Sequence, residues 1–78
     1  MTDRTRIYVA LLDEGVDVWR PVESEQVAED CFLIIEQPYD RDIEFWEFEP
    51  GSVVRVRRLT LSEGECLVAV SLVKGSER

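Results

Sequence analysis

Pro50 and Gly51 stand side by side between an aromatic segment and a valine-rich segment, and no other feature constrains the fold as much. Proline fixes φ at about −65° and glycine accepts a positive φ without a Cβ clash, so residues 49–52 predict a type II turn. Before the turn, Trp46 and Phe48 are spaced as side chains on one face of an extended segment are. The centre of the chain is therefore predicted to turn between extended segments.

The 78 residues predict a single domain near the small end of what folds unaided. A hydrophobic fraction of 45% is typical of a globular domain rather than a disordered one. The longest apolar run, residues 7–12, is far shorter than the span of about 20 residues that a membrane helix needs. No secretory signal is predicted. We expect an ordered β core over residues 5–73, with polar tails at 1–4 and 74–78.

Five segments combine strand-forming residues with turn residues on either side. They are residues 5–12, 16–23, 31–35, 52–61 and 66–73, of which 52–61 is expected to be the longest strand. Short strands with a turn every 8–12 residues, roughly, are typical of small barrels and sandwiches. We predict an all-β fold, a small five-stranded antiparallel barrel that is SH3-like and partly open. Closure explains how so small a sheet buries apolar residues on more than one face.

Details of three segments carry further expectations. Pro21 cannot donate to a ladder, which predicts a sheet edge or a bulge at that position. Residues 24–30 are polar; we favour an extended continuation with a turn at 28–30, and a short helix remains the alternative. In the last strand, one side is expected to carry Cys66, Val68, Val70 and Leu72.

The two cysteines, Cys31 and Cys66, lie far apart in apolar segments. A disulfide or a metal pair is one interpretation, but free cysteine also behaves as a small buried hydrophobe, which we favour. Metal binding would need further ligands at close spacing, and the chain has no histidine. We therefore expect no metal, no cofactor and a cytoplasmic location.

Catalytic groups are scarce. Without histidine, acid–base chemistry would need a carboxylate pair, for which Asp40 with Asp42, or Glu47 with Glu49, are the candidates. A cysteine or serine nucleophile has no evident base, and no glycine-rich phosphate loop occurs. We expect that the protein is not an enzyme.

The chain is acidic, with 17 acidic and 9 basic residues and a net charge of −8. This sign opposes the counterion release that drives nucleic-acid binding, and it disfavours anionic membranes. It also keeps a small protein soluble. We expect a protein partner or self-association rather than nucleic acid or membrane.

Two constellations are candidate partner-binding sites. Arg55 and Arg57 share one face of the predicted strand that follows the turn, opposite Val54 and Val56, and Arg58 follows them. This strip could dock an acidic partner or RNA, or its members could pair with carboxylates on neighbouring strands such as Glu47, Glu49, Glu63 or Glu65.

The second constellation is Trp19 and Arg20, beside Pro21. Tryptophan and arginine are enriched at binding hot spots. The alternative is that Trp19 is covered by a second aromatic cluster, from Tyr8, Trp46 or Phe48. The predicted site residues are thus Trp19, Arg20, Arg55 and Arg57.

Residues 39–49 interleave carboxylates with aromatic side chains, including Asp40, Asp42 and Glu44. Spaced carboxylates with aromatic anchors can neutralise a basic toxin or nuclease. The same pattern also describes a loop that enters a core strand, so both interpretations stay open.

Residues 11–22 and 46–54 resemble a family of short uncharacterised bacterial proteins. Those proteins share a Gly-x-Asp-Val-Trp-Arg-Pro-Val motif and a later Trp-x-Phe-x-Pro-Gly-Ser motif. The resemblance implies a bacterial all-β domain and no particular activity. Residues 48–56 also resemble, more weakly, the KOW-type barrels of translation factors.

Taken together, the sequence predicts a non-enzymatic, protein-binding β-barrel module. The alternatives are an acidic inhibitor or immunity protein that neutralises a basic enzyme or toxin, and a nucleic-acid-binding barrel.

Overall fold

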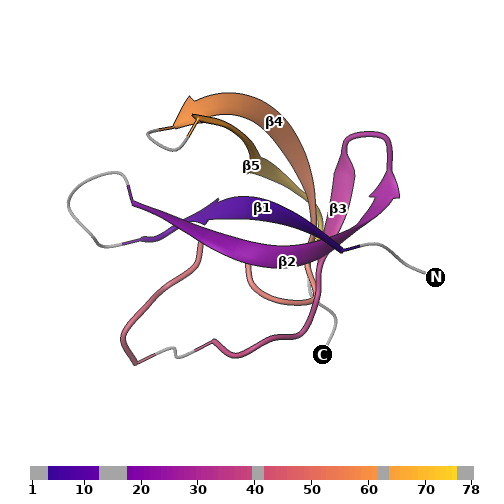
Figure 1. Cartoon of the computed structure of the whole chain (residues 1–78). Helices are drawn as coiled ribbons and strands as arrows, with labels where there is room; N and C mark the ends of the chain where they lie inside the picture. Colours follow the sequence, from indigo (N-terminus) through magenta and orange to yellow (C-terminus); the bar gives the residue numbers. More distant parts are fainter. Residues whose placement is uncertain (1–3, 13–17, 40–41, 62–63, 76–78) are drawn as a thin grey trace.

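A computed structural model describes residues 4–12, 18–39, 42–61 and 64–75, and all regular structure within them is β (Figure 1). The strands are β1 (Arg4–Ala10), β2 (Trp19–Ala28), β3 (Cys31–Ile34), β4 (Val53–Leu61) and β5 (Gly64–Lys74). They form a closed barrel in the order of the sequence. The predicted all-β, five-stranded barrel is confirmed, and the architecture is consistent with a small SH3-like barrel.

The pair that closes the barrel differs from the other four. Each consecutive pair of strands is antiparallel, whereas β1 and β5 are parallel and register through Tyr8 and Val68. When strand direction alternates, the first and last of an odd number of strands run the same way. Closing five such strands therefore requires one parallel pair. The strand orientation is mixed rather than wholly antiparallel, and the barrel is closed rather than partly open.

β2 confirms two expectations about the polar and proline-containing segments. It continues as a strand to Ala28 and turns at Glu29 and Asp30, so the helical alternative for residues 24–30 is wrong. β2 pairs with β3 only from Ser24 onward, which leaves Pro21 in a part of the strand with an open edge on that side. The start of the predicted second strand and the turn before it, residues 13–17, lie outside the described residues.

The side chain of Gln37 replaces the missing strand partner beside that open edge. Its Oε1 accepts from the Glu23 N–H at 3.0 Å, and its Nε2 donates to the Glu23 carbonyl at 2.9 Å. The same Nε2 also donates to the Ile35 carbonyl at 2.9 Å. A side-chain amide thus satisfies backbone groups that a ladder would otherwise pair.

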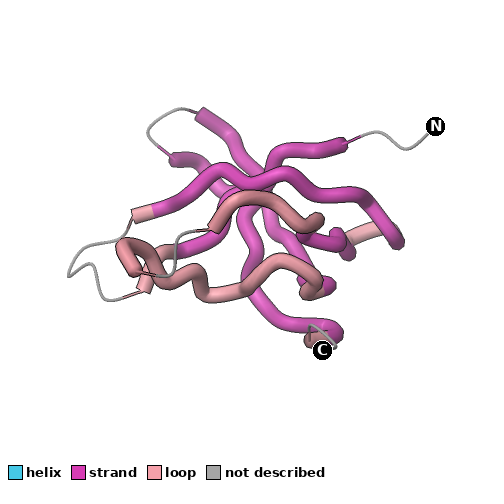
Figure 2. The backbone as a smooth tube through the Cα atoms, turned by 90° about the horizontal axis from the view of Figure 1, so that it is seen from below, coloured by secondary structure: helices cyan, strands magenta, loops and turns pink. Residues whose placement is uncertain are grey.

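The connection from β3 to β4, residues 35–52, lies below the barrel in Figure 1 and in front of the strands in Figure 2. Its backbone pairs with the end of β1, where Leu11 and Trp46 form an antiparallel bridge. The Leu12 N–H donates to the Phe45 carbonyl at 2.7 Å, and the Glu47 N–H donates to the Ala10 carbonyl at 2.9 Å. The connection therefore extends the sheet beyond β1.

The predicted turn is present at the end of this connection. Gly51 has φ of 92°, and the Ser52 N–H donates to the Glu49 carbonyl at 3.1 Å, as a type II turn requires. The Gly51 N–H also donates to the Ile34 carbonyl at 2.7 Å. The turn thus joins the connection to β3.

The barrel interior is filled by alternating side chains from all five strands and by one residue of the connection. Its buried members are Ile7, Val9, Val22, Phe32, Ile34, Trp46, Val54 and Ala69. Ser24 is fully buried among the strands, and its hydroxyl donates to the Thr5 carbonyl at 2.7 Å. The buried polar group is therefore satisfied.

β5 departs from the predicted alternation. Ala69 pairs with Val56 but Ser71 pairs with Arg55, so Val70 is an extra residue in β5; a second shift follows near Val73. Such bulges reverse which side chains face the core. The expected shared side is therefore wrong: Val68 lies opposite Arg57 and Leu72 lies opposite Val54, so the two are on different faces, and Val70 and Leu72 are exposed. β5, with 11 residues, is also longer than β4, with 9, contrary to expectation.

Replacing Gly51 by alanine is expected to lower the free energy of unfolding by on the order of 1–2 kcal/mol, because the positive φ strains any residue with a Cβ. Urea denaturation followed by tryptophan fluorescence measures the change. Gly75→Ala is the control, since Gly75 has no positive φ and its added Cβ meets only the Leu72 Cδ2 at 3.9 Å. Equal losses in both variants would contradict the role of the turn.

Candidate functional site

The four predicted site residues lie at two separate places. Arg55 and Arg57 are exposed on the outer face of β4, while Trp19 and Arg20 begin β2. Around the barrel, the register runs from Arg57 to Val68, then to Tyr8, and then to Pro21. With adjacent strands about 4.8 Å apart, this row spans about 14 Å. Trp19 is half-buried on the face opposite Val22, so it is neither a core residue nor a fully exposed anchor.

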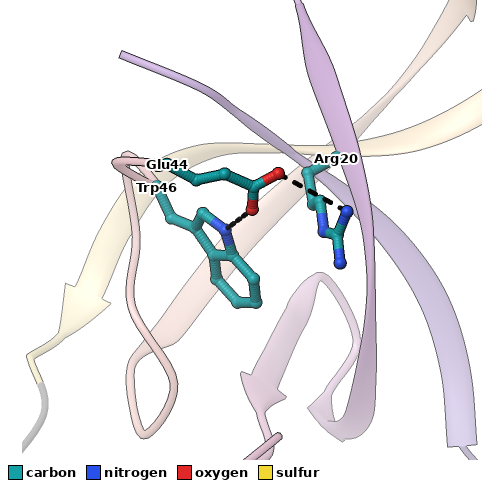
Figure 3. A network of polar contacts seen from close by, with 3 residues as sticks. All are labelled: Arg20, Glu44 and Trp46. Atoms are coloured by element: carbon teal, nitrogen blue, oxygen red, sulfur yellow. Dashed lines mark hydrogen bonds and ion pairs between the residues drawn. The ribbon is translucent and has the colours of Figure 1, made fainter. Parts of the chain in front are cut away.

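Arg20 belongs to a polar network that fixes the connection to β2 (Figure 3). The Glu44 carboxylate accepts from the Trp46 indole Nε1 at 2.9 Å and from Arg20 NH1 at 3.5 Å. Figure 3 shows this carboxylate between the indole and the guanidinium group. The Trp46 side chain is buried, whereas 46% of the Arg20 side chain is exposed. Arg20 therefore has a structural partner within the chain.

Tyr39 holds Trp46 from a second direction. The two rings stack with centroids 4.3 Å apart and an interplanar angle of 20°. The Trp46 backbone N–H also donates to the Tyr39 hydroxyl at 2.8 Å. Buried tryptophan usually finds a partner for its polar N–H, and here both of its N–H groups are satisfied by side chains of the connection.

Some residues of the acidic and aromatic run 39–49 therefore hold the connection in place, and others lie on the exposed surface. Glu44 and Tyr39 anchor the connection, which supports the interpretation of a loop that enters the core. Asp42, Glu47 and Glu49 remain on the exposed surface. Asp40 lies outside the described residues.

An open hollow of about 340 Å³ lies beside the network, lined by Arg20, Pro38, Tyr39, Ile43 and Glu44. Ile43 is 72% exposed, and the nearby connection also exposes Phe45. The lining offers apolar contact and one satisfied ion pair. Within the described ranges, no group of three residues could hold a metal ion.

A second hollow, of about 420 Å³, is lined by residues of all five strands and of the β2–β3 turn, and sequence reasoning did not predict it. Its lining is Thr5, Gln26, Glu29, Asp30, Phe32, Val56, Arg58 and Leu67. Arg58 therefore lies at this mouth of the barrel rather than in the outer arginine strip. It pairs with Glu65 at 3.7 Å, and both side chains are largely exposed.

Arg55 and Arg57 differ from Arg58 in their surroundings. Among the residues that the structure describes, neither has an ion pair or a side-chain hydrogen bond. The expectation of neutralising cross-strand pairs is thus met only by Arg58 with Glu65; Glu63 lies outside the described residues. Two exposed guanidinium groups on one strand remain available to a partner.

The end of β5 carries Val70 and Leu72, which the sequence predicted to share one side of the strand with Cys66 and Val68. We define the β5 edge as residues 70–73, where Val70, Leu72 and Val73 are 42%, 53% and 48% exposed. β4 pairs with one side of this segment. On the other side, β1 pairs with β5 only at Val68, and no described residue pairs with the β5 edge. The nearly continuous apolar run 67–73 could have predicted this surface, because such a run places apolar side chains on both faces of a strand.

Searches with the whole chain found no matching family model, no matching curated protein and no matching solved structure. The motif resemblance to short bacterial proteins therefore stays a prediction. No helix that could cross a bilayer occurs in the part of the chain that the structure describes. The functional argument accordingly depends on the geometry of the surface.

Glu44→Ala is expected to lower the free energy of unfolding by about 1–3 kcal/mol, because the buried indole N–H of Trp46 loses its acceptor. Glu44→Gln keeps an oxygen acceptor and loses only the charge toward Arg20, so it should stay within about 1 kcal/mol of the wild type. Urea denaturation measures both.

Glu47→Ala is the matched control for these variants, because Glu47 is an exposed glutamate in the same connection. It should leave stability unchanged. A Glu44→Gln variant as unstable as Glu44→Ala would show that charge, rather than the hydrogen bond to Trp46, holds the connection.

Proposed function

We propose that this protein is a non-enzymatic, protein-binding β-barrel module and that the β5 edge is its main contact surface. The observation that carries the proposal is a strand segment whose backbone lacks a described ladder partner on one side and whose side chains include three exposed aliphatic residues. Natural proteins usually shield such edges, because they template pairing with another chain. A strand edge that is left unshielded and carries exposed apolar side chains is typical of a binding site.

Two physical contributions would stabilise a bound strand at this edge. Its backbone would pair with unpaired N–H and C=O groups of β5, which is the basis of peptide recognition by strand addition. Its side chains would also cover Leu72 and the flanking valines, and each 100 Å² of apolar surface removed from water contributes about 2.5 kcal/mol. The bulges at Val70 and Val73 shape the edge, which favours particular partners over indiscriminate pairing.

The module is proposed to act in a reducing, cytoplasmic compartment and without catalysis. Cys31 and Cys66 are both free and half-buried, less buried than the small core residues we expected. The Cys66 thiol lies 3.4 Å from the Gly64 carbonyl and donates to it. Since the chain has no histidine, acid–base chemistry at neutral pH would depend on carboxylates alone.

An acidic inhibitor remains the second candidate, and the exposed carboxylates of the connection favour it. Asp42, Glu47 and Glu49 are exposed there, and the described part of the connection has no basic residue. Because Glu44 is needed by Trp46, this candidate is tested by reversing Asp42 and Glu47 to lysine, not Glu44. It requires that the reversal abolish binding to a basic partner at low salt.

Leu72→Glu is expected to abolish capture of the physiological partner from a lysate of the source cells, because a charge would replace the central apolar contact of the β5 edge. Val27→Glu is the matched control: Val27 is 54% exposed and Leu72 is 53% exposed, but Val27 lies on β2. Circular dichroism confirms that both variants fold. Capture that is the same for the wild type and both variants would refute the β5 edge as the binding surface.

A further inference from the structure

Charge is divided between two sides of the barrel. The three strands β4, β5 and β1, which are neighbours around the barrel, carry six basic residues and one carboxylate. These are Arg4, Arg6, Arg55, Arg57, Arg58 and Lys74, with Glu65 as the acid. We call this half of the barrel the basic half.

The remaining described residues have the opposite balance. β2 carries Glu23 and Glu25 with Arg20, and β3 carries no charge. The described turns and loops contain acidic residues and no basic ones: Glu29, Asp30, Glu36, Asp42, Glu44, Glu47 and Glu49. Among the described residues, the basic side chains therefore gather on β4, β5 and β1 although the net charge of the chain is −8.

Salt limits how far the acidic side can act. The Debye length is about 8 Å at physiological ionic strength, whereas the molecule measures 36 × 32 × 20 Å. A ligand at the basic half is therefore largely screened from carboxylates on the far side. Its electrostatic environment is set by the arginines nearest to it.

The β5 edge lies within the basic half. Arg55 is directly opposite Ser71 in the β4–β5 register, and Arg57 is opposite Val68. Ser71 is small and exposed, so no bulky side chain separates Arg55 from the edge at this position. A strand added there would run about 10 Å from β4, two strand spacings away, with its outward side chains beside these arginines.

We propose that the partner contributes an extended segment of alternating apolar and acidic residues, which adds to the β5 edge as a strand. Its apolar side chains pack against Leu72, and its carboxylates face Arg55, which lies opposite Ser71. Arg57 lies opposite Val68, where β1 already pairs with β5, and adds positive charge beside the end of the bound strand. This inference rests on the proposed function and adds the chemistry of the partner. Arg55 supplies a charge-assisted contact that also fixes the register of the bound strand, and Arg57 strengthens the attraction for its carboxylates.

Two other occupants fit the edge less well. Nucleic acid would use the arginines but would leave the unpaired backbone and the aliphatic side chains of the edge unsatisfied, and the stacking platforms it needs are limited to half-buried Tyr8 and Trp19 on this outer face. A second copy paired edge to edge would bring the arginines of both copies to one sheet, where like charges repel.

The probes are fluorescein-labelled nine-residue peptides, one alternating valine with glutamate and one alternating valine with lysine. Fluorescence anisotropy with the full chain is expected to show binding of the glutamate peptide and about tenfold weaker binding of the lysine peptide. The double variant Arg55→Glu with Arg57→Glu should reverse this preference. Arg58→Glu is the matched control, because Arg58 is an exposed arginine of the same strand that lines the barrel mouth, and it should leave binding unchanged.

Several results would overturn the inference. They are equal binding of both peptides, binding of neither, or binding that ignores the double substitution. Binding of an oligothymidine probe through Arg55 and Arg57 without peptide binding would assign the basic half to nucleic acid, and dimerisation abolished by Leu72→Glu would assign the edge to a second copy. If capture of a partner from the lysate still requires Leu72, the β5 edge remains a protein-binding surface even when the acidic-peptide inference fails. Failure of this inference is therefore distinguishable from failure of the proposed function.

Discussion

The single parallel contact between β1 and β5 is the constraint on which this barrel depends. Five strands of alternating direction close only if the first and last run the same way, and here they register at one position, Tyr8 with Val68. Past that position the two strands separate. The chain after β1 pairs with the connection through Leu11 and Trp46, whereas β4 is the only described strand that pairs with residues 69–73 of β5. Closure and the free β5 edge thus have the same geometrical origin.

The connection completes the core that so short a closing contact leaves open. Trp46 enters the interior, and its indole N–H, backbone N–H and ring face are each held by Glu44 or Tyr39. Without these partners, the buried indole N–H of Trp46 would have no hydrogen-bond acceptor. The free-energy cost of such an unsatisfied group exceeds what the hydrogen bond itself contributes. At the open edge of β2, the side-chain amide of Gln37 likewise hydrogen-bonds the backbone N–H and carbonyl of Glu23. A small barrel with few strands therefore depends on side chains of its longest connection.

The sequence predicts what depends on local rules and misses what depends on distant partners. The turn at Pro50 and Gly51 follows from two residues, and the outward direction of Arg55 and Arg57 follows from alternation. The bulges in β5 follow from how β4 and β5 must fit around the barrel, so strict alternation wrongly put Val70 and Leu72 on the same side as Cys66 and Val68. Likewise, the pairing of Arg20 with Glu44 spans 24 positions. The sequence therefore predicts Arg20 as a binding residue and does not reveal its partner Glu44 within the chain.

The distribution of charge over the surface, rather than the net charge, determines which partners are favoured. The acidic total disfavours polyanionic partners only if charge is spread evenly over the surface, because screening restricts each charge to its neighbourhood. In this chain, the strands β1, β4 and β5 hold nearly all described basic residues, while the turns and loops hold most of the acidic ones. A partner at the β5 edge therefore meets a positive surface on a negative protein. That local sign, together with backbone groups that another extended chain would pair in a ladder, is the basis on which an acidic peptide is proposed.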